Sequence, residues 1–428
     1  MPGGACLTSP VSAAHSILRH HRQPIVVDSL WAERMSALRQ LNEDATRLIE
    51  AAKELAPLIR EQRAAIEENR QLPPSLVGAM VDAGLFRMYV PRQLGGLEVH
   101  PVTFSRVVEE ISRIDGATGW NLTVGAVYGA LAAFLRDDVA REIYGSPPEA
   151  IVAGTINPTG RADAVDGGFR VTGRWAFGSG IKQASWITGN CFVYDGNERR
   201  IGASGAPELR IVFFRADACQ IHDTWKVGGL RGTGSHDFSV TDLFVPVERS
   251  LIAFTAPSFQ PGALYACPFI TIFAATIAAP ALGMARGAID CLKELAVAKT
   301  PTGSTGLLRD RASVQSDVAR AEALLLSAQA FLYNALDDLM DATAAGREVT
   351  MEERAMVRLA SAHAGISSAQ AVDLMYNAGG ASSIYESSPL ERFFRDVHAA
   401  TQHIAVLANN YELTGRVLLG LPPGTARF

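Results

Sequence analysis

The sequence has no pair of cysteines close enough to bind a metal ion together or to suggest a framework of disulfides. Its five cysteines are widely separated and no CxxC motif occurs: Cys6, Cys191, Cys219, Cys267 and Cys291. This spacing indicates reduced thiols in a cytoplasmic protein and argues against a structural zinc site. His20 and His21 are adjacent but have no third ligand nearby. We therefore expect no metal ion.

An excess of positive charge is also missing. The 428 residues include 39 Lys and Arg against 44 Asp and Glu, so the formal net charge is -5. Without a basic field, we expect no nucleic acid and no anionic membrane surface as a partner. No strand-like segment is followed by a GxGxxG turn, which excludes a nicotinamide site of the βαβ type.

Long uncharged runs are present, but strongly apolar ones are not. Residues 117–135 and 251–285 carry no charged side chain, yet both are diluted by Ala, Gly and Thr, and prolines interrupt the second. A membrane-spanning helix is richer in Leu, Ile, Val and Phe and has aromatic or basic flanks. Both runs therefore favour helices buried inside a bundle. Residues 1–28 lack the apolar core of a secretory signal.

The spacing of apolar residues changes twice along the chain. Helical spacing holds over residues 38–69, a further helix opens at Pro73–Pro74, and helical patterns continue to Tyr144. Short β-type runs separated by Gly, Asp and Asn follow, with a hairpin signal at Asp166–Gly167. Helical spacing then returns over four stretches: 263–298, 313–345, 351–378 and 392–419.

These patterns predict a mainly α fold with a β-barrel-like insert. We place a flexible N-terminal extension at residues 1–34 and an N-terminal helical domain at 35–150. A middle β-domain follows at 151–255, and a C-terminal four-helix bundle at 256–428. Translation can start at Met1 or at Met35, and the sequence leaves both open.

Several motifs in a fixed order resemble one known family. The string VTGRWAFGSG, Val171–Gly180, resembles the flavin-contacting strand and turn of acyl-CoA dehydrogenases. Further matches to that family lie at Gly84–Gly96, at Gly228–Ser235 before Val245–Pro246, and at Gly379–Gly380 before Pro389–Arg392 and Arg395–Asp396. The resemblance extends from about residue 38 to the C-terminus, and it implies the acyl-CoA dehydrogenase-like fold.

Two adjacent residues depart from the dehydrogenase pattern. Acyl-CoA dehydrogenases carry a tyrosine and then a proton-abstracting glutamate a few residues after the Arg-Asp pair, and here the tyrosine position is His403 and the glutamate position is Ile404. Some relatives place the base on the first bundle helix instead, but no Asp or Glu occurs between Glu248 and Asp290. An isoleucine cannot accept a proton. The sequence therefore disfavours a dehydrogenase.

The same segment resembles the flavin-dependent two-component monooxygenases of this superfamily. That resemblance implies reduced flavin, FMN or FAD, delivered by a separate NAD(P)H:flavin reductase, and oxygen transfer from O2 through a C4a-hydroperoxyflavin. It makes Ser179 and His403 the catalytic candidates. A hydroxyl at Ser179 can hold the N5 proton in a dry pocket. His403, which we expect to titrate near neutrality, can donate to the peroxide or deprotonate a substrate.

The resemblance also implies a set of cofactor contacts. We expect Trp120 and Phe177 to flank the flavin ring, because its apolar surface favours aromatic walls. Gly379 and Gly380 permit close approach of the backbone. Guanidinium groups bind phosphate in pairs, which makes Arg309 and Arg311 candidates, across a subunit boundary if need be. The complete set is Trp120, Thr155, Phe177, Gly178, Ser179, Arg309, Arg311, Gly379 and Gly380.

Alternatives remain at three points. His398 and His363 compete with His403 for the place at the flavin, whereas Arg392 and Asp396 fit structural ion pairs. The substrate is a small aromatic or heteroaromatic molecule, or an amine that is N-oxygenated as in the nitrosynthases. An acyl-CoA dehydrogenase with an unrecognised base and an inactive flavoprotein are the other hypotheses. Uncharged Ala-rich helices predict a homotetramer.

Overall fold

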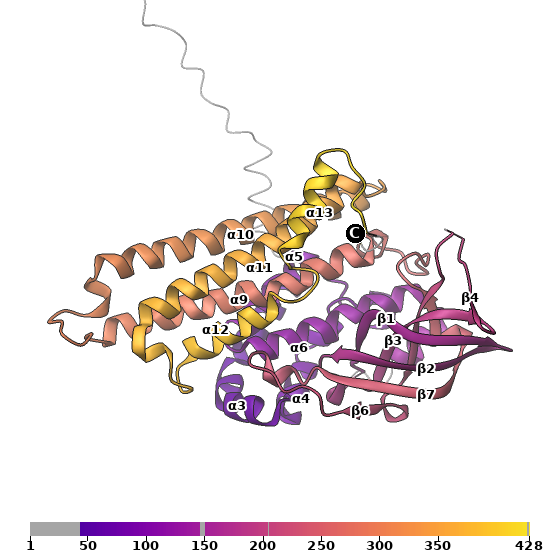
Figure 1. The fold of residues 1–428 in the computed structure, drawn as a ribbon, viewed down its shortest axis with the longest axis horizontal. Coiled ribbons are helices and arrows are strands. Elements are labelled where there is room, and N and C mark those ends of the chain that lie inside the picture. The colour runs from indigo at the N-terminus through magenta and orange to yellow at the C-terminus, as the bar shows by residue number, and fades with distance from the viewer. Residues whose placement is uncertain (1–42, 146–149, 204, 426–427) are drawn as a thin grey trace, which may run out of the picture. The chain divides into compact units, whose positions relative to one another are not determined.

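A computed structural model describes residues 43–145, 150–203, 205–425 and 428 of the chain. Contacts divide the chain into two units, Met1–Glu43 and Asp44–Phe428. The predicted N-terminal extension, both candidate start residues and the His20–His21 pair lie outside the described residues. Helices come first, a β-sheet follows and helices return, which confirms the predicted fold class (Figure 1).

The first helices pack around one fully buried helix, α6, Gly116–Val127. Asp115 caps α6 and accepts a hydrogen bond from the Thr118 backbone N–H at 2.8 Å. The other elements of this part are α2 Glu43–Glu54, α3 Ala56–Asn69, α4 Pro74–Asp82, η1 Leu85–Arg87, η2 Arg92–Leu94, α5 Pro101–Ser112, η3 Tyr128–Phe134, α7 Asp137–Ala140 and η4 Arg141–Gly145.

Within the described part, the helix predicted from the spacing over residues 38–69 is present. It is interrupted at Leu55, between α2 and α3. Pro57 lies in the first turn of α3, where its missing N–H costs nothing, but it would remove a hydrogen bond and clash with the preceding turn inside a continuous helix.

One sheet of eight strands forms the middle of the chain. The strands are β1 Val152–Val165, β2 Gly168–Gly178, β3 Trp186–Asp195, β4 Glu198–Arg199, β5 Leu209–Arg215, β6 Gln220–His222, β7 His236–Pro246 and β8 Ser250–Ile252. Their order is β6-β7-β2-β1-β3-β5-β8, with β4 paired to β3, and only β1 and β3 run parallel among the described pairs.

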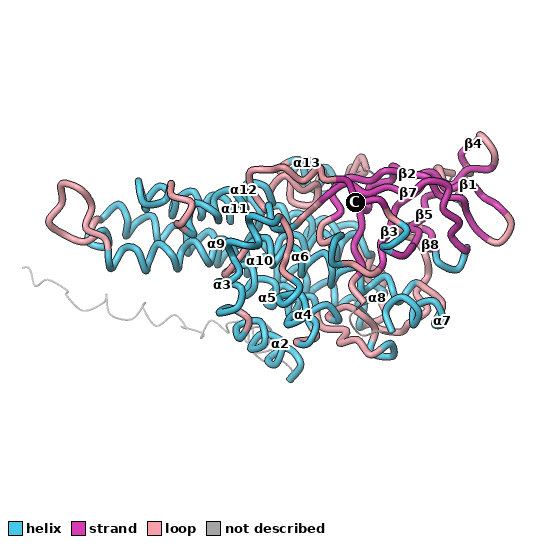
Figure 2. Tube along the Cα trace, turned by 90° about the horizontal axis from the view of Figure 1, so that it is seen from below, coloured by secondary structure: helices cyan, strands magenta, loops and turns pink. Residues whose placement is uncertain are grey.

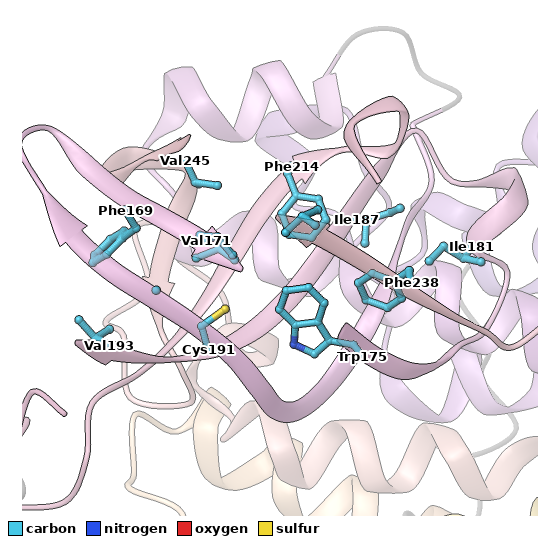
Figure 3. Close-up of a cluster of buried hydrophobic side chains, with 13 residues drawn as sticks. Phe169, Val171, Trp175, Ile181, Ile187, Cys191, Val193, Phe214, Phe238 and Val245 are labelled. Carbon is cyan, nitrogen blue, oxygen red and sulfur yellow. The ribbon is translucent and has the colours of Figure 1, made fainter. Parts of the chain in front are cut away.

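The sheet folds around its own core (Figure 3). Trp175 on β2 is fully buried there, stacks on Phe238 at 5.2 Å between ring centroids, and donates to the Asn190 carbonyl at 2.9 Å. Apolar side chains that alternate along the strands fill this core. Because the buried Trp175 side chain fixes the end of β2, it also fixes the position of the Gly-Ser-Gly turn that follows.

Long helices make up the rest of the chain: α8 Ala263–Ala266, α9 Phe269–Ala298, η9 Leu308–Asp310, α10 Ala312–Ala344, α11 Met351–Gly379, η10 Gly380–Ser383, α12 Pro389–Ala400 and α13 Asn409–Leu418. Figures 1 and 2 show α9, α10 and α11 side by side with α12 beside them. By length and composition α9 passes a test for a membrane span, but 94% of its most apolar window is buried inside the protein, as in a core helix.

The last predicted helix, 392–419, is wrong as a single element. Residues 401–408 form turns between α12 and α13. The Asn410 side chain donates to the carbonyls of Ile404 and Leu407 at 3.0 and 2.8 Å, and it accepts from Arg358 at 2.9 Å. Side-chain hydrogen bonds of this kind compete with helical ones. His403 therefore lies in a turn and not on a helix.

Candidate active site

The hydroxyl groups of Ser179, Ser235 and Thr233 form a buried, hydrogen-bonded row that begins beside Trp120 on α6. The Trp120 indole N–H donates to Ser179 Oγ at 3.1 Å, and Ser179 Oγ lies 2.7 Å from Ser235 Oγ. Ser235 Oγ lies 2.6 Å from Thr233 Oγ1, which donates to the Leu230 carbonyl at 2.8 Å. The helix α6, the turn after β2 and the loop before β7 thus meet at Ser179.

The backbone fixes this turn as firmly as the side chains do. The Ser179 N–H donates to the Phe177 carbonyl and the Gly180 N–H to the Thr233 carbonyl, both at 2.9 Å. Gly180 has φ +68°, a conformation that side chains other than glycine disfavour. Ser179 itself is 6% exposed. Its hydroxyl is a positioned group and not the solvated side chain of an ordinary turn.

His403 reaches the same place from the opposite side. Its ring meets that of Trp120 edge-on at 5.7 Å between centroids and that of Phe273 on α9 at 6.0 Å. The His403 Nδ1 accepts the Ala405 backbone N–H at 3.2 Å, so the neutral ring carries its proton on Nε2. The ring lies deep in the protein and keeps some exposed surface.

The expected titration of His403 near neutrality is wrong. Burial lowers the pKa of His403 from 6.5 to about 4, because desolvation penalises the imidazolium, and burial is the sole cause of this shift. His403 is therefore uncharged at neutral pH and presents an N–H donor at Nε2. The structure favours hydrogen-bond donation over the alternative role as a base.

The carboxylates of the described residues do not supply the missing base. Ile404, at the position of the dehydrogenase glutamate, is 51% exposed. Glu109 is bound by the Tyr333 hydroxyl at 2.6 Å and by Gln329 at 2.7 Å. Asp396 accepts the Leu230 backbone N–H at 2.6 Å. Both buried carboxyls have a pKa raised to about 7, chiefly by desolvation, but both serve contacts between elements.

Arg392 forms the predicted structural ion pairs, whereas Asp396 forms a hydrogen bond to the backbone. Arg392 pairs with Asp115 at 3.1 Å and with Glu67 at 3.2 Å, while Asp396 caps the loop at Leu230. The Asp396 Oδ2 atom is buried and has no hydrogen-bond partner in the described part of the chain. Repulsion from Asp115 adds to desolvation in raising the Asp396 pKa.

Phe177 stands out among the predicted cofactor contacts. It is 67% exposed, has φ +65°, and meets Trp225 edge-on at 6.2 Å between ring centroids. A bulky non-glycine residue in this region is strained, and strain of this kind gathers at functional sites. Gly178 follows in β2, where a Cβ atom would lie 2.9 Å from Ile181. Thr155 lies in an irregular stretch of β1, between Gly154 and Pro158.

The remaining cofactor candidates lie at the other end of α9. Leu308 donates to the Lys299 carbonyl at 2.8 Å, which places Arg309 and Arg311 beside the end of that helix, and Lys299 Nζ donates to the Gly379 carbonyl at 2.8 Å. From Phe273 to the end of α9 the chain rises roughly 40 Å at about 1.5 Å per residue. Figure 1 shows the sheet and the α9–α10 connection at opposite ends of the helices. A single chain therefore does not bring Arg309, Arg311 and the Gly379–Gly380 pair close to Ser179.

The competing histidines lie elsewhere. His398 Nε2 is 2.9 Å from Asp373 Oδ1 on the bundle surface. His363 on α11 is 3.3 Å from the Tyr411 hydroxyl and contacts the ring of Phe331. Among the three, His403 is the one in contact with Trp120.

Sequence reasoning missed Ser235, Thr233 and Phe273. Thr233 and Ser235 lie within Gly228–Ser235, a stretch that resembles the family but for which no hydrogen-bonding role was predicted. The pattern Thr-Gly-Ser carries the signal, because two hydroxyls on either side of a glycine can hydrogen-bond to each other.

Comparison with known proteins identifies the family. Residues 38–142 match the N-terminal domain of acyl-CoA dehydrogenases and residues 275–407 match their C-terminal domain. Indole-3-acetate monooxygenase of Pseudomonas putida is 31% identical over 364 residues, covering 85% of this chain and 91% of that protein. The flavin-dependent monooxygenase oxygenase subunit HsaA of Mycobacterium tuberculosis is 31% identical over 400 residues, covering 91% and 99%.

A solved structure shows the same fold with flavin. XiaF from Streptomyces sp., in complex with FADH2 and glycerol, superposes with a TM-score of 0.83 at 25% identity, covering 93% of this chain and 99% of that one. The fold and the site thus define an oxygenase of the acyl-CoA dehydrogenase-like class. The chain belongs to the flavin-dependent monooxygenases of this class, as an oxygenase subunit that uses reduced flavin. An oxygenase subunit implies a separate flavin reductase.

Proposed function

We propose that this chain oxygenates a small aromatic or heteroaromatic substrate beside Ser179 and His403, with FMN or FAD in its reduced form and O2. The observation that carries the proposal is that Trp120 contacts both Ser179 and His403, while Ile404 and not a carboxylate stands at the position of the dehydrogenase base. Indole-3-acetate monooxygenase, at 31% identity, supports an aromatic substrate.

The residues of this site fit a reduced flavin ring. Trp120, Phe177 and Phe273 offer aromatic surface, and Ser179 offers a buried hydroxyl. Reduced flavin, when bound, supplies the electrons that activate O2. The protein contributes position, the exclusion of water, and an uncharged N–H donor at His403 Nε2 that can bind an oxygen atom of O2 or of substrate.

A second copy of the chain completes the cofactor site in this proposal. Gly379, Gly380, Arg309 and Arg311 lie at the far end of the bundle, where Gly380 faces open space and Arg309 is largely exposed. Apolar side chains exposed near there include Ile384 at 62% and Tyr385 at 64%. Burial of such side chains between copies would stabilise a homotetramer and bring the arginines to a flavin phosphate.

The supply of reduced flavin belongs to the same proposal. A separate NAD(P)H:flavin reductase delivers it, in a reducing compartment such as the cytoplasm, where the four described cysteines stay as thiols. The test is reconstitution with an unrelated flavin reductase, NADH and a panel of phenols, indoles and amines. We expect one oxygen atom to be added to a phenol or an indole. If only amines are oxygenated, the proposal of an aromatic substrate is wrong and the alternative, N-oxygenation of an amine, takes its place.

A further inference from the structure

The hydroxyl row at Ser179 has a direction. A carbonyl oxygen only accepts, so the single proton of Thr233 Oγ1 points at the Leu230 carbonyl 2.8 Å away. Thr233 must then accept from Ser235, 2.6 Å away, and Ser235 must accept from Ser179, 2.7 Å away. Ser179 in turn accepts the Trp120 N–H, which cannot act in any other way.

In this arrangement Ser179 donates its hydroxyl proton to Ser235 and not to a ligand. A serine hydroxyl has one proton and two lone pairs, and here the proton faces Ser235 and one lone pair faces Trp120. What remains for a ligand is a lone pair. Ser179 is therefore an acceptor toward anything bound beside it.

Two features oppose reversal of the row. Ser179, Thr233 and Ser235 are all at most 6% exposed, so water does not compete for their lone pairs. The Leu230 carbonyl also accepts the Trp225 indole N–H at 3.0 Å and the Thr233 backbone N–H at 3.1 Å, but its contact with the Thr233 hydroxyl is the shortest of the three. In the reversed row, Thr233 would donate to Ser235 and Ser179 would donate to the ligand.

We infer that Thr233 and Ser235 make this site selective for reduced over oxidised flavin, by holding Ser179 as a hydrogen-bond acceptor. Reduced flavin carries a proton on N5 and can donate it to Ser179, whereas oxidised flavin has a bare N5 that also only accepts. In oxidised flavin, N5 and Ser179 Oγ are both hydrogen-bond acceptors, so no hydrogen bond forms between them. The inference rests on the proposed function and on the place of N5 beside Ser179 that the family resemblance implies. Thr233 and Ser235 are positioning residues, since neither contacts the ligand.

The experiment measures binding and not turnover. Oxidised and dithionite-reduced FMN and FAD are titrated anaerobically into the full-length protein. The ratio of the dissociation constant of oxidised flavin to that of reduced flavin is compared among variants. Ser235→Ala releases the Ser179 proton, which can then turn toward a bare N5. We expect oxidised flavin to bind more tightly and the ratio to fall by about 5- to 100-fold, the range for one unsatisfied buried hydrogen-bonding group.

Matched variants separate this effect from damage to the fold. Thr233→Val removes the hydroxyl at nearly constant volume and should lower the ratio as Ser235→Ala does. Thr233→Ser and Ser235→Thr keep the hydroxyl and should restore it. Ser105→Ala is the control, because the Ser105 hydroxyl on α5 is equally buried and donates to the Pro101 carbonyl at 3.0 Å, outside the row.

The outcomes are distinguishable from failure of the proposed function. If wild-type protein binds reduced flavin and oxygenates substrate while Ser235→Ala and Thr233→Val leave the ratio unchanged, the inference is overturned and the function stands. If Ser235→Ala weakens oxidised flavin selectively, the row runs in reverse, which also overturns it. If wild-type protein binds neither form of flavin, the proposed function fails first.

Discussion

His403 makes folding stability depend on pH in a known direction. Its pKa is about 4 in the folded chain and ordinarily 6.5. Between these values the unfolded chain binds a proton that the folded chain does not, so stability is lost as the pH falls from about 6.5 toward 4. The loss is on the order of 3 kcal/mol.

We expect His403→Gln to remove this dependence, because glutamine does not titrate. The measurement is urea unfolding of both proteins at pH 7.5 and pH 5. Wild-type protein should lose more stability on acidification than the variant does, whereas His398→Gln, a change at a partly exposed residue, should behave like wild type. Equal losses in wild type and His403→Gln would show that the ring is not buried as described.

The same residue should govern coupling of O2 use to product. In His403→Ala the Nε2 donor is lost, and the loss of one positioned hydrogen-bond donor typically costs about 10²–10³-fold in rate. We expect reduced flavin to bind normally while hydrogen peroxide replaces most of the product. The yield of product per O2 consumed is the readout. Full coupling in this variant would remove His403 from the mechanism.

Asp396 acts on stability with the opposite sign. Its folded pKa is about 7 against an ordinary 3.8, so stability is lost as the pH rises from about 4 to 7. Asp396→Asn keeps an acceptor for the Leu230 N–H without the buried charge, and it should be at least as stable as wild type at pH 8. Asp396→Ala should cost about 1–3 kcal/mol, because that N–H loses its partner. Denaturation at pH 8 that ranks Asn below Ala would contradict this.

At the scale of elements, α9 approaches α5 closely because residue 283 has no side chain. A Cβ atom at Gly283 would lie 2.4 Å from the Glu109 carbonyl oxygen. Gly283→Ala should therefore destabilise the protein by about 1–3 kcal/mol. Gly415 in α13 has nothing within 4 Å, and Gly415→Ala should stabilise by about 0.5–1 kcal/mol. Chemical denaturation that gives both changes the same sign would count against this packing.

The order of helices, sheet and helices could be predicted because apolar spacing is a local property of the chain. The interruptions were harder. Pro57 and Pro268 are visible in the sequence, but the turns at 401–408 depend on Asn410 binding to Arg358, a contact that exists only after folding. Such tertiary hydrogen bonds leave no periodic trace.

The site shows the same limit. Ser179 and His403 could be named from motifs, but the depressed pKa of His403 comes from burial by elements far apart in the sequence. The role of Ser235 and Thr233 depends on distances between hydroxyls, which no spacing rule encodes. Arg309 and Arg311 could be chosen for their chemistry, yet a single folded chain places them far from Ser179.

At the scale of the whole molecule, we expect a particle of about four times 45.7 kDa by light scattering. A monomer at micromolar concentration would contradict the proposal that a second copy completes the site. A sharper test mixes two inactive proteins, Ser179→Ala and a double variant with Arg309→Ala and Arg311→Ala. Co-refolded mixtures should regain part of the activity, because some sites then combine intact residues from both chains. If no activity is recovered, Ser179 and the two arginines do not belong to one site shared between copies.

A single turnover without any nicotinamide tests oxygen transfer from O2 to substrate most directly. Wild-type protein is loaded with photoreduced flavin, mixed with ¹⁸O2 and a phenol or indole that reconstitution identifies as substrate, and the product is analysed by mass spectrometry. We expect one ¹⁸O atom, and no oxygen from water, to be added to the product. Product without ¹⁸O, or bleaching of oxidised flavin by an acyl-CoA in the absence of a reductase, would contradict the proposed oxygenation.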